Sequence, residues 1–599
     1  MNKKNWGASA LLALFLLSMS SRTPAACKVA ALEIPVTMVG FRAIATLGIN
    51  GTDIPLIVDS GAFYSFLTHA AAQQLELDVD PLPYGMRIEG LTGRIEASRT
   101  QVKRLKLLGG EIPDVEFIVG GNGENGAMGL LGRNILAITD IEYDLGAGSI
   151  RLMFPNEDCD GKKMGYWAGD KAVAELELLR DEQRSKIPPI QAIAKLNDKA
   201  MRVLLDTGAQ SIVSLRAAKR AGITDMKPAG KVRGAGRGEA NAWTATAEKF
   251  ELGDEAISNI RVIVADFEQD QDMLLGIDFF LSHRIYISKK QRRMYFTYNG
   301  GSVFALNAIE RAIAGATDLS SAPGPASTEE PTDAAGYARR GAASAARLDF
   351  AHALADLDRA CAMTPQLAEY FVRRAAVHEM MQQWQPALKD LDAALLLEPA
   401  NTEARLRRAW LRAGANDGDG TVFDLQFLDS SLAPQAHQRL EMGDLYEKFD
   451  LTRRALPQWT LWISAHPHDA KLASTLNSRC WAKMKLNIEL DQALDDCDKA
   501  IDLQDQNGHY YDSRAWLRLR RGELRKALAD FERALKHLPD SPWSLYGRSI
   551  VRRKLGDAPG AQADIQAARK HRPTIDDDVG RQGLAAEPEP LHRGGASSS

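Results

Sequence analysis

The chain has 599 residues, of which 45% are apolar and 25% are charged, and its formal net charge at pH 7 is −4. This composition is that of an ordinary globular protein with several domains, and it excludes disorder over the whole length. The nearly balanced charge gives no overall attraction to nucleic acid or to an anionic membrane, so we expect no nucleic-acid partner.

The N-terminus predicts an export signal. Two lysines precede an apolar stretch over 8–17, and small residues follow it, which is the pattern of a signal peptide over residues 1–26. The apolar stretch is too short to span a bilayer. We therefore expect a periplasmic or secreted protein with no transmembrane helix after signal removal. Lipid anchoring through Cys27 is an alternative that we disfavour, because Pro24 stands where a lipobox prefers leucine.

The most informative feature of the chain is a short motif that occurs twice. An aspartate, a hydroxyl residue, a glycine and an alanine follow an apolar run in both places: Asp59, Ser60, Gly61 and Ala62, then Asp206, Thr207, Gly208 and Ala209. Each copy has a strand-like stretch upstream and a Leu-Leu-Gly segment downstream. The glycines of these segments, Gly132 and Gly276, lie 73 and 70 residues after the aspartates. The repeat predicts two copies of one β domain, lobe 1 over 30–156 and lobe 2 over 170–307.

Two carboxylates held in such turns indicate acid–base chemistry. If the turns meet, the carboxyl groups cannot both ionise cheaply, and they share one proton. One group then acts as a general base toward water while the other protonates the carbonyl of a peptide bond, without any metal or cofactor. Ser60 and Thr207 would tie the two turns together by hydrogen bonds, and Gly61 and Gly208 would let the backbone bend.

These motifs resemble the two halves of the retropepsin-type aspartic protease signature, over roughly residues 30–300. The resemblance implies two all-β lobes with one active site between them, with Asp59 and Asp206 as the catalytic pair. It also implies that the Leu-Leu-Gly segments cross behind the turns. A mobile hairpin, or flap, is implied in each lobe, with the candidate glycines Gly90, Gly93, Gly234 and Gly236. The implied activity is that of an aspartic endopeptidase, which hydrolyses a polypeptide bound in an extended conformation.

Two alternatives stay open on the sequence alone. The lobes could keep the fold without turnover, which would give a catalytically silent peptide-binding or scaffold protein. Each lobe could also pair with its own copy in a second chain, which would bring Asp59 to Asp59 and Asp206 to Asp206. The segment 155–186 between the lobes is long enough to span a domain diameter and contains a strand-like stretch, so we favour pairing within one chain.

Export would permit disulfides among the five cysteines. Cys27 precedes lobe 1 and Cys159 follows its last strand, while Cys480 and Cys497 are 17 residues apart in one predicted helical pair. We therefore consider two bridges, Cys27–Cys159 and Cys480–Cys497, with Cys361 left as a small buried residue. The alternative is that all five are reduced or that only one pair forms.

From about residue 334 the chain changes to helical spacing, after a linker over 308–333 that is rich in small residues. Pro365 and Pro399 are 34 residues apart, as are Pro539 and Pro573, and small residues recur 12 and five positions before them. The pattern resembles tetratricopeptide (TPR) repeats. It predicts an all-α solenoid of six or seven repeats over 334–575, whose surface would bind a protein partner. The last segment, 577–599, reads as disordered.

Two groups of solenoid residues could be taken for ligand sites. His466 and His468 flank a proline, but no third metal ligand stands nearby in the sequence, so we expect a turn and no metal. Trp459, Trp462 and Trp481 could line a binding box, but tryptophans at helical spacing more often belong to the core, which we expect here.

Overall fold

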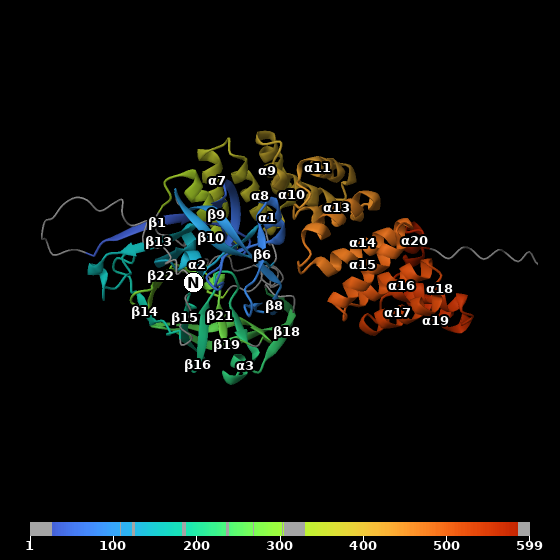
Figure 1. Ribbon diagram of the computed structural model, residues 1–599, viewed down its shortest axis with the longest axis horizontal. Coiled ribbons are helices and arrows are strands. Elements are labelled where there is room, and N and C mark those ends of the chain that lie inside the picture. The colour runs from blue at the N-terminus through green and yellow to red at the C-terminus, as the bar shows by residue number, and fades with distance from the viewer. Residues whose placement is uncertain are drawn as a thin grey trace, which may run out of the picture.

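The computed structural model describes residues 27–107, 109–121, 126–181, 187–234, 239–267, 269–301, 303–304 and 330–584. The expected signal peptide, most of the expected linker, Gly236 and the end of the expected tail lie outside this set. Figure 1 shows a β-rich part followed by a helical part that curves away from it. The predicted fold class, two β lobes and an α solenoid, is confirmed.

Lobe 1 is a sheet of eight strands that closes on itself. Its strands are β2 (Thr37–Val39), β3 (Arg42–Ile49), β4 (Thr52–Val58), β5 (Phe66–Leu67), β6 (Val79–Pro81), β9 (Ala97–Leu107), β10 (Gly110–Gly120) and β11 (Gly129–Leu131). The order is β2-β3-β4-β11-β5-β10-β9-β6, and β3 also pairs with β9. The lobe adds a separate hairpin, β7 (Ile88–Gly90) and β8 (Gly93–Ile95), and the helices α1 (His69–Gln74) and α2 (Arg133–Leu136).

Lobe 2 repeats this topology. Its elements are β15 (Gln191–Leu196), β16 (Lys199–Leu205), β17 (Ile212–Ser214), α3 (Leu215–Arg220), β18 (Met226–Arg233), β19 (Glu239–Leu252), β20 (Glu255–Ala265), β21 (Met273–Leu275) and α4 (Ile277–Ser282). The order is β15-β16-β21-β17-β20-β19-β18, and β15 also pairs with β19. Even the helix starts correspond: the hydroxyls of Thr68 and Ser214 accept hydrogen bonds from the N–H groups of Ala71 and Ala217, which caps α1 and α3.

A third sheet joins the two lobes. It contains β1 (Val29–Pro35), β12 (Asp140–Asp144), β13 (Ser149–Pro155), β14 (Ala174–Glu177), β22 (His283–Ser288) and β23 (Arg293–Tyr298), in the order β1-β13-β12-β22-β23-β14. Strand β12 of lobe 1 pairs antiparallel with β22 of lobe 2, with Tyr143 opposite Ile285. In this structure the lobes therefore pair within one chain, as we favoured, and not each with a copy of itself.

A buried carboxylate reinforces the joint between the lobes. Glu142 on β12 is fully buried, and it accepts hydrogen bonds from Arg151 on β13 (2.5 Å) and from Arg284 on β22 (2.9 Å). Tyr166 is the third residue that donates a hydrogen bond to the same carboxylate. A buried charge is costly unless it is fully paired. Because the bond from Arg284 forms only in the observed register of β12 against β22, the stability of the joint depends on this register.

Two disulfides are present, and they join the cysteines considered above. Cys27 is bonded to Cys159, which fastens the start of lobe 1 to the short helix η2 (Glu157–Cys159) behind its last strand. Cys480 is bonded to Cys497 within one helical pair of the solenoid. Cys361 is free and buried.

The solenoid consists of seven antiparallel helical pairs and one final helix. The pairs are α6 (Ala334–Ala346) with α7 (Phe350–Met363), α8 (Ala368–Met380) with α9 (Trp384–Leu397), α10 (Thr402–Gly414) with α11 (Gly418–Ser431), α12 (Arg439–Lys448) with α13 (Thr452–Ala465), α14 (Leu472–Leu486) with α15 (Leu490–Leu503), α16 (Gly508–Arg520) with α17 (Leu524–His537), and α18 (Pro542–Lys554) with α19 (Ala558–His571).

Within the described residues, no helix combines the length and the hydrophobicity that crossing a bilayer requires.

The expected boundary of the disordered tail is wrong by about eight residues. Helix α20 (Ile575–Arg581) continues past residue 577, and Val579 and Leu584 are buried against the last helical pairs. These apolar residues cover the open end of the array, where a repeat would otherwise expose its core.

The tryptophans singled out above belong mainly to the solenoid core. Trp459 and Trp462 are buried, and Trp481 is half-buried against the core of the C-terminal pairs. His466 stacks on Trp462 with ring centroids 4.5 Å apart. No group of three or more metal-ligating side chains is found among the residues that the structure describes.

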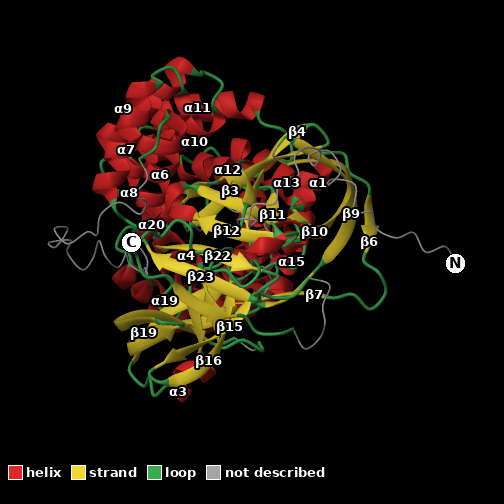
Figure 2. Cartoon of the chain, turned by 90° about the vertical axis from the view of Figure 1, so that its left-hand side faces the viewer, coloured by secondary structure: helices red, strands yellow, loops and turns green. Residues whose placement is uncertain are grey.

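The solenoid is attached to the lobes through its first helix. Ala342, Ala343 and Ala346 of α6 belong to the same buried cluster as the core of the lobes, and Arg347 donates a hydrogen bond to the carbonyl of Gly300 (3.3 Å). Figures 1 and 2 place the first helical pairs beside lobe 1, at the end of the molecule opposite β16, β19 and α3. The solenoid is thus packed against lobe 1 and is not a free appendage.

An arginine–aspartate pair recurs along the solenoid. In five helical pairs an arginine of the first helix donates two hydrogen bonds to an aspartate 16 residues later in the second helix: Arg340–Asp356, Arg374–Asp390, Arg408–Asp424, Arg514–Asp530 and Arg548–Asp564. Arg479 and Asp496 form the same contact with one residue more between them. The pair α12–α13 has Met442 and Gln458 at these places, so the series is interrupted there.

We expect Arg514→Met to destabilise the solenoid by about 2–3 kcal/mol, because the buried carboxylate of Asp530 loses the two hydrogen bonds from Arg514 and keeps only the one from Arg518. Thermal unfolding followed by circular dichroism at 222 nm measures the loss. The matched control is Arg525→Met, which changes an exposed arginine of the neighbouring helix. Equal melting temperatures for the two variants would contradict the structural role of the pair.

Candidate active site

The two aspartate turns are locked together by four hydrogen bonds between Ser60 and Thr207 and their surroundings. The hydroxyl of Ser60 donates to the carbonyl of Leu205 (2.9 Å) and accepts from the N–H of Thr207 (3.0 Å). The hydroxyl of Thr207 donates to the carbonyl of Val58 (2.8 Å) and accepts from the N–H of Ser60 (2.9 Å). Each hydroxyl therefore bonds to the backbone of the opposite lobe, and both side chains are fully buried.

This arrangement places the carboxyl groups of Asp59 and Asp206 next to each other. The glycines of the two turns make the approach possible. A Cβ on Gly61 would lie 2.5 Å from Cγ of Asp206, and a Cβ on Gly208 would lie 2.4 Å from Cγ of Asp59. Both distances are far below van der Waals contact, so any side chain at these positions would push the carboxyl groups apart.

The two carboxyl groups differ in their hydrogen bonds. Asp59 Oδ1 accepts from the N–H groups of Gly61 and Ala62 (both 2.8 Å), whereas Asp206 Oδ1 accepts from the N–H of Gly208 alone (2.9 Å). Burial raises the pKa of Asp206 well above its usual range, and repulsion from Asp59 raises it further. The proton of the pair is therefore expected on Asp206 and the negative charge on Asp59.

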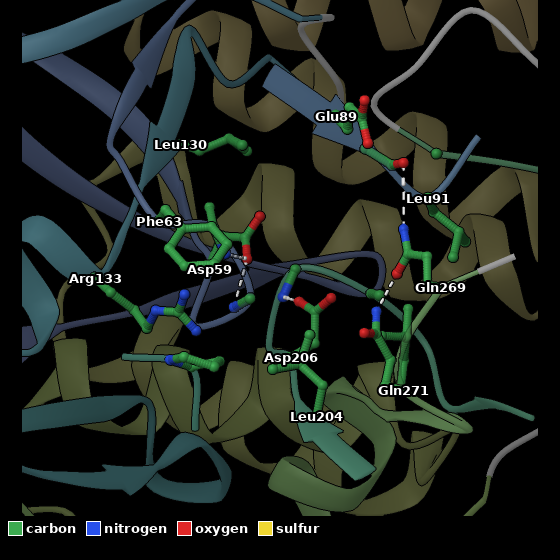
Figure 3. Close-up of a pocket in the computed structure, with 18 of the residues that line it drawn as sticks. Asp59, Phe63, Glu89, Leu91, Leu130, Arg133, Leu204, Asp206, Gln269 and Gln271 are labelled. Carbon is green, nitrogen blue, oxygen red and sulfur yellow. Dashed lines mark hydrogen bonds between the residues drawn. The ribbon is translucent and has the colours of Figure 1, made fainter. Parts of the chain in front are cut away.

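A cleft of about 1870 Å³ lies over the two carboxyl groups. Figure 3 shows Asp59 and Asp206 side by side on its floor, with Leu130 of lobe 1 and Leu204 of lobe 2 on either side. Of the supporting residues predicted from the sequence, Gly61, Ala62, Gly208 and Ala209 all line the cleft. A cleft of this size, open and between two lobes, suits an extended chain better than a small molecule.

The Leu-Leu-Gly segments lie behind the turns, as the resemblance implied. Strand β11 runs parallel to β4, and β21 runs parallel to β16, each directly beside the strand that carries the aspartate. A Cβ on Gly132 would lie 2.2 Å from the carbonyl oxygen of Tyr64, and one on Gly276 would lie 2.4 Å from that of Ala209. Both glycines are therefore needed because the loop after each turn passes directly over them.

Sequence reasoning missed a group of residues on the lobe 1 wall. The guanidinium of Arg133 is almost completely buried, donates to the carbonyl of Ser60 (3.3 Å), and lies 4.4 Å from the ring centroid of Phe63. Phe63 is 48% exposed in the cleft. Arg42 donates across the lobes to the carbonyl of Gly208. The sequence carried a signal for Phe63 only: two residues, Phe63 and Tyr64, follow the turn of lobe 1 before the next serine, whereas one residue stands at this place in lobe 2.

The flap candidates of the two lobes touch each other. The lobe 1 hairpin (β7 and β8, with Gly90 and Gly93 beside its tip) lines the cleft, and the N–H of Gly234 donates to the hydroxyl of Thr92 (3.2 Å). Gly234 follows β18 directly, while Gly236 lies outside the described residues. Leu91 at the hairpin tip packs on lobe 2, so the hairpin spans the mouth of the cleft.

Each lobe braces its turn from behind with a serine and an amide or acid. In lobe 1, Asn134 Oδ1 accepts bonds from the N–H and the hydroxyl of Ser65 (both 2.8 Å). In lobe 2, Asp278 Oδ1 accepts the same two bonds from Ser211 (3.0 and 2.6 Å). Burial raises the pKa of Asp278 to about 6, although its hydrogen bonds with Ser211 pull it the other way.

We expect Asp278→Asn to stabilise the protein at neutral pH. The pKa of this carboxyl is raised on folding from 3.8 to about 6, so ionisation above pH 6 costs up to about 3 kcal/mol of folding stability, and the cost disappears below pH 4. The melting temperature of the variant should exceed that of the wild type at pH 7.5 and approach it at pH 4.

The reciprocal variant, Asn134→Asp, is the matched control for this effect. It places an acid in the equivalent position of lobe 1 and should lower the melting temperature at pH 7.5. A gain for Asp278→Asn that is the same at both pH values would show that the titration of Asp278 is not its cause.

Comparison with known proteins supports the resemblance of the two lobes to aspartic proteases. The family model of aspartyl proteases matches the chain in two regions, residues 45–135 and 192–279, one in each lobe. The prediction of two retropepsin-like lobes followed by TPR-like repeats is confirmed. Among curated proteins, no sequence matches this chain.

Solved structures resemble the helical part only distantly. A tetratricopeptide repeat protein from Parabacteroides merdae is 15% identical, covers 42% of this chain and 99% of its own, and gives a TM-score of 0.31. The Cut9 and Hcn1 complex of APC/C is 14% identical over 37% of this chain and 43% of its own, with a TM-score of 0.29. YrrB, a TPR protein with an unusual peptide-binding site, is 14% identical over 38% of this chain and 98% of its own, with a TM-score of 0.22. These scores are too low to support an argument, and the nature of the solenoid rests on its own helical pairs and 34-residue spacing.

Proposed function

We propose that the protein is an exported aspartic endopeptidase that hydrolyses peptide bonds with Asp59 and Asp206. The observation that carries the proposal is the paired carboxyl groups on the floor of the cleft, with one proton expected between them. A fold without this pair would support binding alone. The lysine-flanked apolar N-terminus supports export to the periplasm or the medium.

The proposed reaction needs only these two groups and a water molecule. Asp59, as the ionised member, takes a proton from water, which attacks the carbonyl carbon of the scissile bond. Asp206, as the protonated member, gives its proton to the carbonyl oxygen, which yields a tetrahedral diol. As the C–N bond breaks, Asp59 gives the proton it took from water to the departing nitrogen, and Asp206 takes back a proton from one hydroxyl of the diol. The two acids exchange their protonation states during the cycle, which their close approach favours.

The substrate would lie extended across the floor of the cleft. Its backbone would bond to the edge of the lobe 1 hairpin, and its side chains would occupy pockets beside residues such as Phe63 and Leu130. The solenoid would bind a protein partner or a remote part of the substrate, which is the usual use of such curved arrays.

The competing proposal is a catalytically silent scaffold that holds an extended peptide without cutting it. Turnover separates the two. We expect Asp59→Asn and Asp206→Asn each to lower kcat/KM on a peptide library by at least about a hundredfold, because each variant removes one half of the acid–base pair. Asp225→Asn, an exposed aspartate of lobe 2, is the control and should keep full activity.

The outcomes of that experiment are distinct. If the folded wild type cleaves no peptide, the scaffold proposal stands. Cleavage that a statine-type inhibitor does not block would also contradict the aspartic peptidase. Activity that survives in one of the two variants would mean that the two aspartates do not work as one pair.

We also expect kcat/KM to fall as the pH rises through the raised pKa of Asp206. The protonated form of this group is the acid of the proposed reaction, so deprotonation of Asp206 removes activity on the alkaline side. A pH profile of kcat/KM measures the effect. A pH profile of kcat/KM without a fall on its alkaline side would contradict the assignment of Asp206 as the acid.

A further inference from the structure

The lobe 1 hairpin is held at its tip by lobe 2. Leu91 packs on a cluster formed by the buried residues Ile212, Ala265 and Phe267. The side chain of Gln269 donates to the carbonyl of Gly90 (3.3 Å), which adds a polar contact to the tip. Figure 3 shows Gln269 below Glu89 and Leu91 of the hairpin. A polypeptide can enter the cleft from this side only if these contacts open.

The stem of the same hairpin is held by the solenoid. Glu96 follows β8 directly, and its Oε2 lies 2.6 Å from Nδ1 of His468, in the turn between α13 and α14. The ring of His468 also contacts the ring of His69, the first residue of α1, with centroids 4.7 Å apart. A helix of the solenoid, α13, packs against α1 at this place. The turn around His468 is therefore wedged between α1 and the hairpin stem.

This contact is the second attachment of the solenoid to lobe 1. The first is α6, whose alanines are buried in the lobe core. The helices from α7 to α13 lie between the two attachments, so the solenoid forms an arch from the joint between the lobes to the hairpin stem. The helical pair at the second attachment, α12–α13, is the one that lacks the recurring arginine–aspartate pair.

We propose that His468 is a positioning residue for the lobe 1 hairpin, which it holds over the cleft through Glu96. It does not touch the two catalytic candidates, and it acts from outside the lobes that carry them. The kinetic consequence rests on the proposed peptidase function, whereas the structural consequence does not.

Hydrogen exchange of the full-length protein without substrate tests the structural consequence. His468→Ala removes the contact, and amides across 86–96 should exchange about two- to five-fold faster, which is the effect expected of a partly exposed pair. His468→Asn keeps an N–H donor near the position of Nδ1 and should restore exchange close to the wild-type rate. His571→Ala breaks a histidine–aspartate contact inside the solenoid, with Asp540 at 3.5 Å, and should leave the hairpin unchanged.

A double-mutant cycle with Glu96→Gln identifies the partner. If His468 acts through Glu96, the effects of the two substitutions on exchange are less than additive. Faster exchange in His468→Ala that is simply added to that of Glu96→Gln would overturn the assignment of Glu96. Unchanged exchange across 86–96 in folded His468→Ala would overturn the inference as a whole.

The KM and kcat of the His468→Ala variant test the kinetic consequence. Since the hairpin lines the cleft in which the proposed substrate would lie, loosening it should raise the KM of a peptide substrate by about the same two- to five-fold and change kcat by less than twofold. A peptidase whose KM does not respond to His468→Ala would overturn the inference while the proposed function stands. A protein without peptidase activity whose hairpin still loosens would remove the proposed function and leave the positioning role of His468.

Discussion

The exchange of hydrogen bonds between Ser60 and Thr207 is the constraint on which the site depends. Each hydroxyl is fully buried and uses both its donor and its acceptor capacity on the backbone of the other lobe. A buried polar group that lost its partner would cost its full desolvation energy, so the two turns cannot separate without a large penalty. The close approach of the two carboxyl groups follows from this, and it is the reason that we expect them to share one proton. The glycines beside the serine and the threonine are then required, because no other residue fits between the turns.

The sheet between the lobes carries this constraint into the rest of the fold. Strands β12 and β22 pair across the boundary, and the buried Glu142 holds arginines from β13 and β22. A slip of one residue would turn Glu142 to the other face of the sheet and remove the acceptor that Arg151 and Arg284 share. The same sheet fixes the turns, because β12 and β22 follow the helices α2 and α4 that pack behind them.

The duplicated motif made the lobes and the aspartate pair predictable, because each functional residue had a counterpart in the same local pattern. The repeat period did the same for the solenoid. Contacts between segments far apart in the chain had no such signal: nothing near Glu96 or His468 in the sequence indicates that they meet. The arginine–aspartate pairs are a different case. Their 34-residue spacing is present in the sequence. The repeat was recognised from its prolines and alanines, however, so the contacts between the arginines and the aspartates were not predicted. The end of the solenoid was placed too early for a related reason, since the period stops at Pro573 while the apolar residues of α20 continue.

A single chain with two lobes allows the halves to diverge in a way that two identical subunits cannot. Lobe 1 has Phe63 over a buried arginine and an amide, Asn134, behind its turn; lobe 2 has a shorter loop and an acid, Asp278, at the equivalent place. The disulfide of the β part and both attachments of the solenoid also lie on the lobe 1 side. Lobe 2 contributes the apolar cluster that receives Leu91. In the described residues the hairpin of lobe 1 is thus tied at one end to the solenoid and at the other to lobe 2. A change in the curvature of the solenoid would therefore reach the cleft through one wall, while the floor that holds the two carboxyl groups stays fixed by its buried hydrogen bonds.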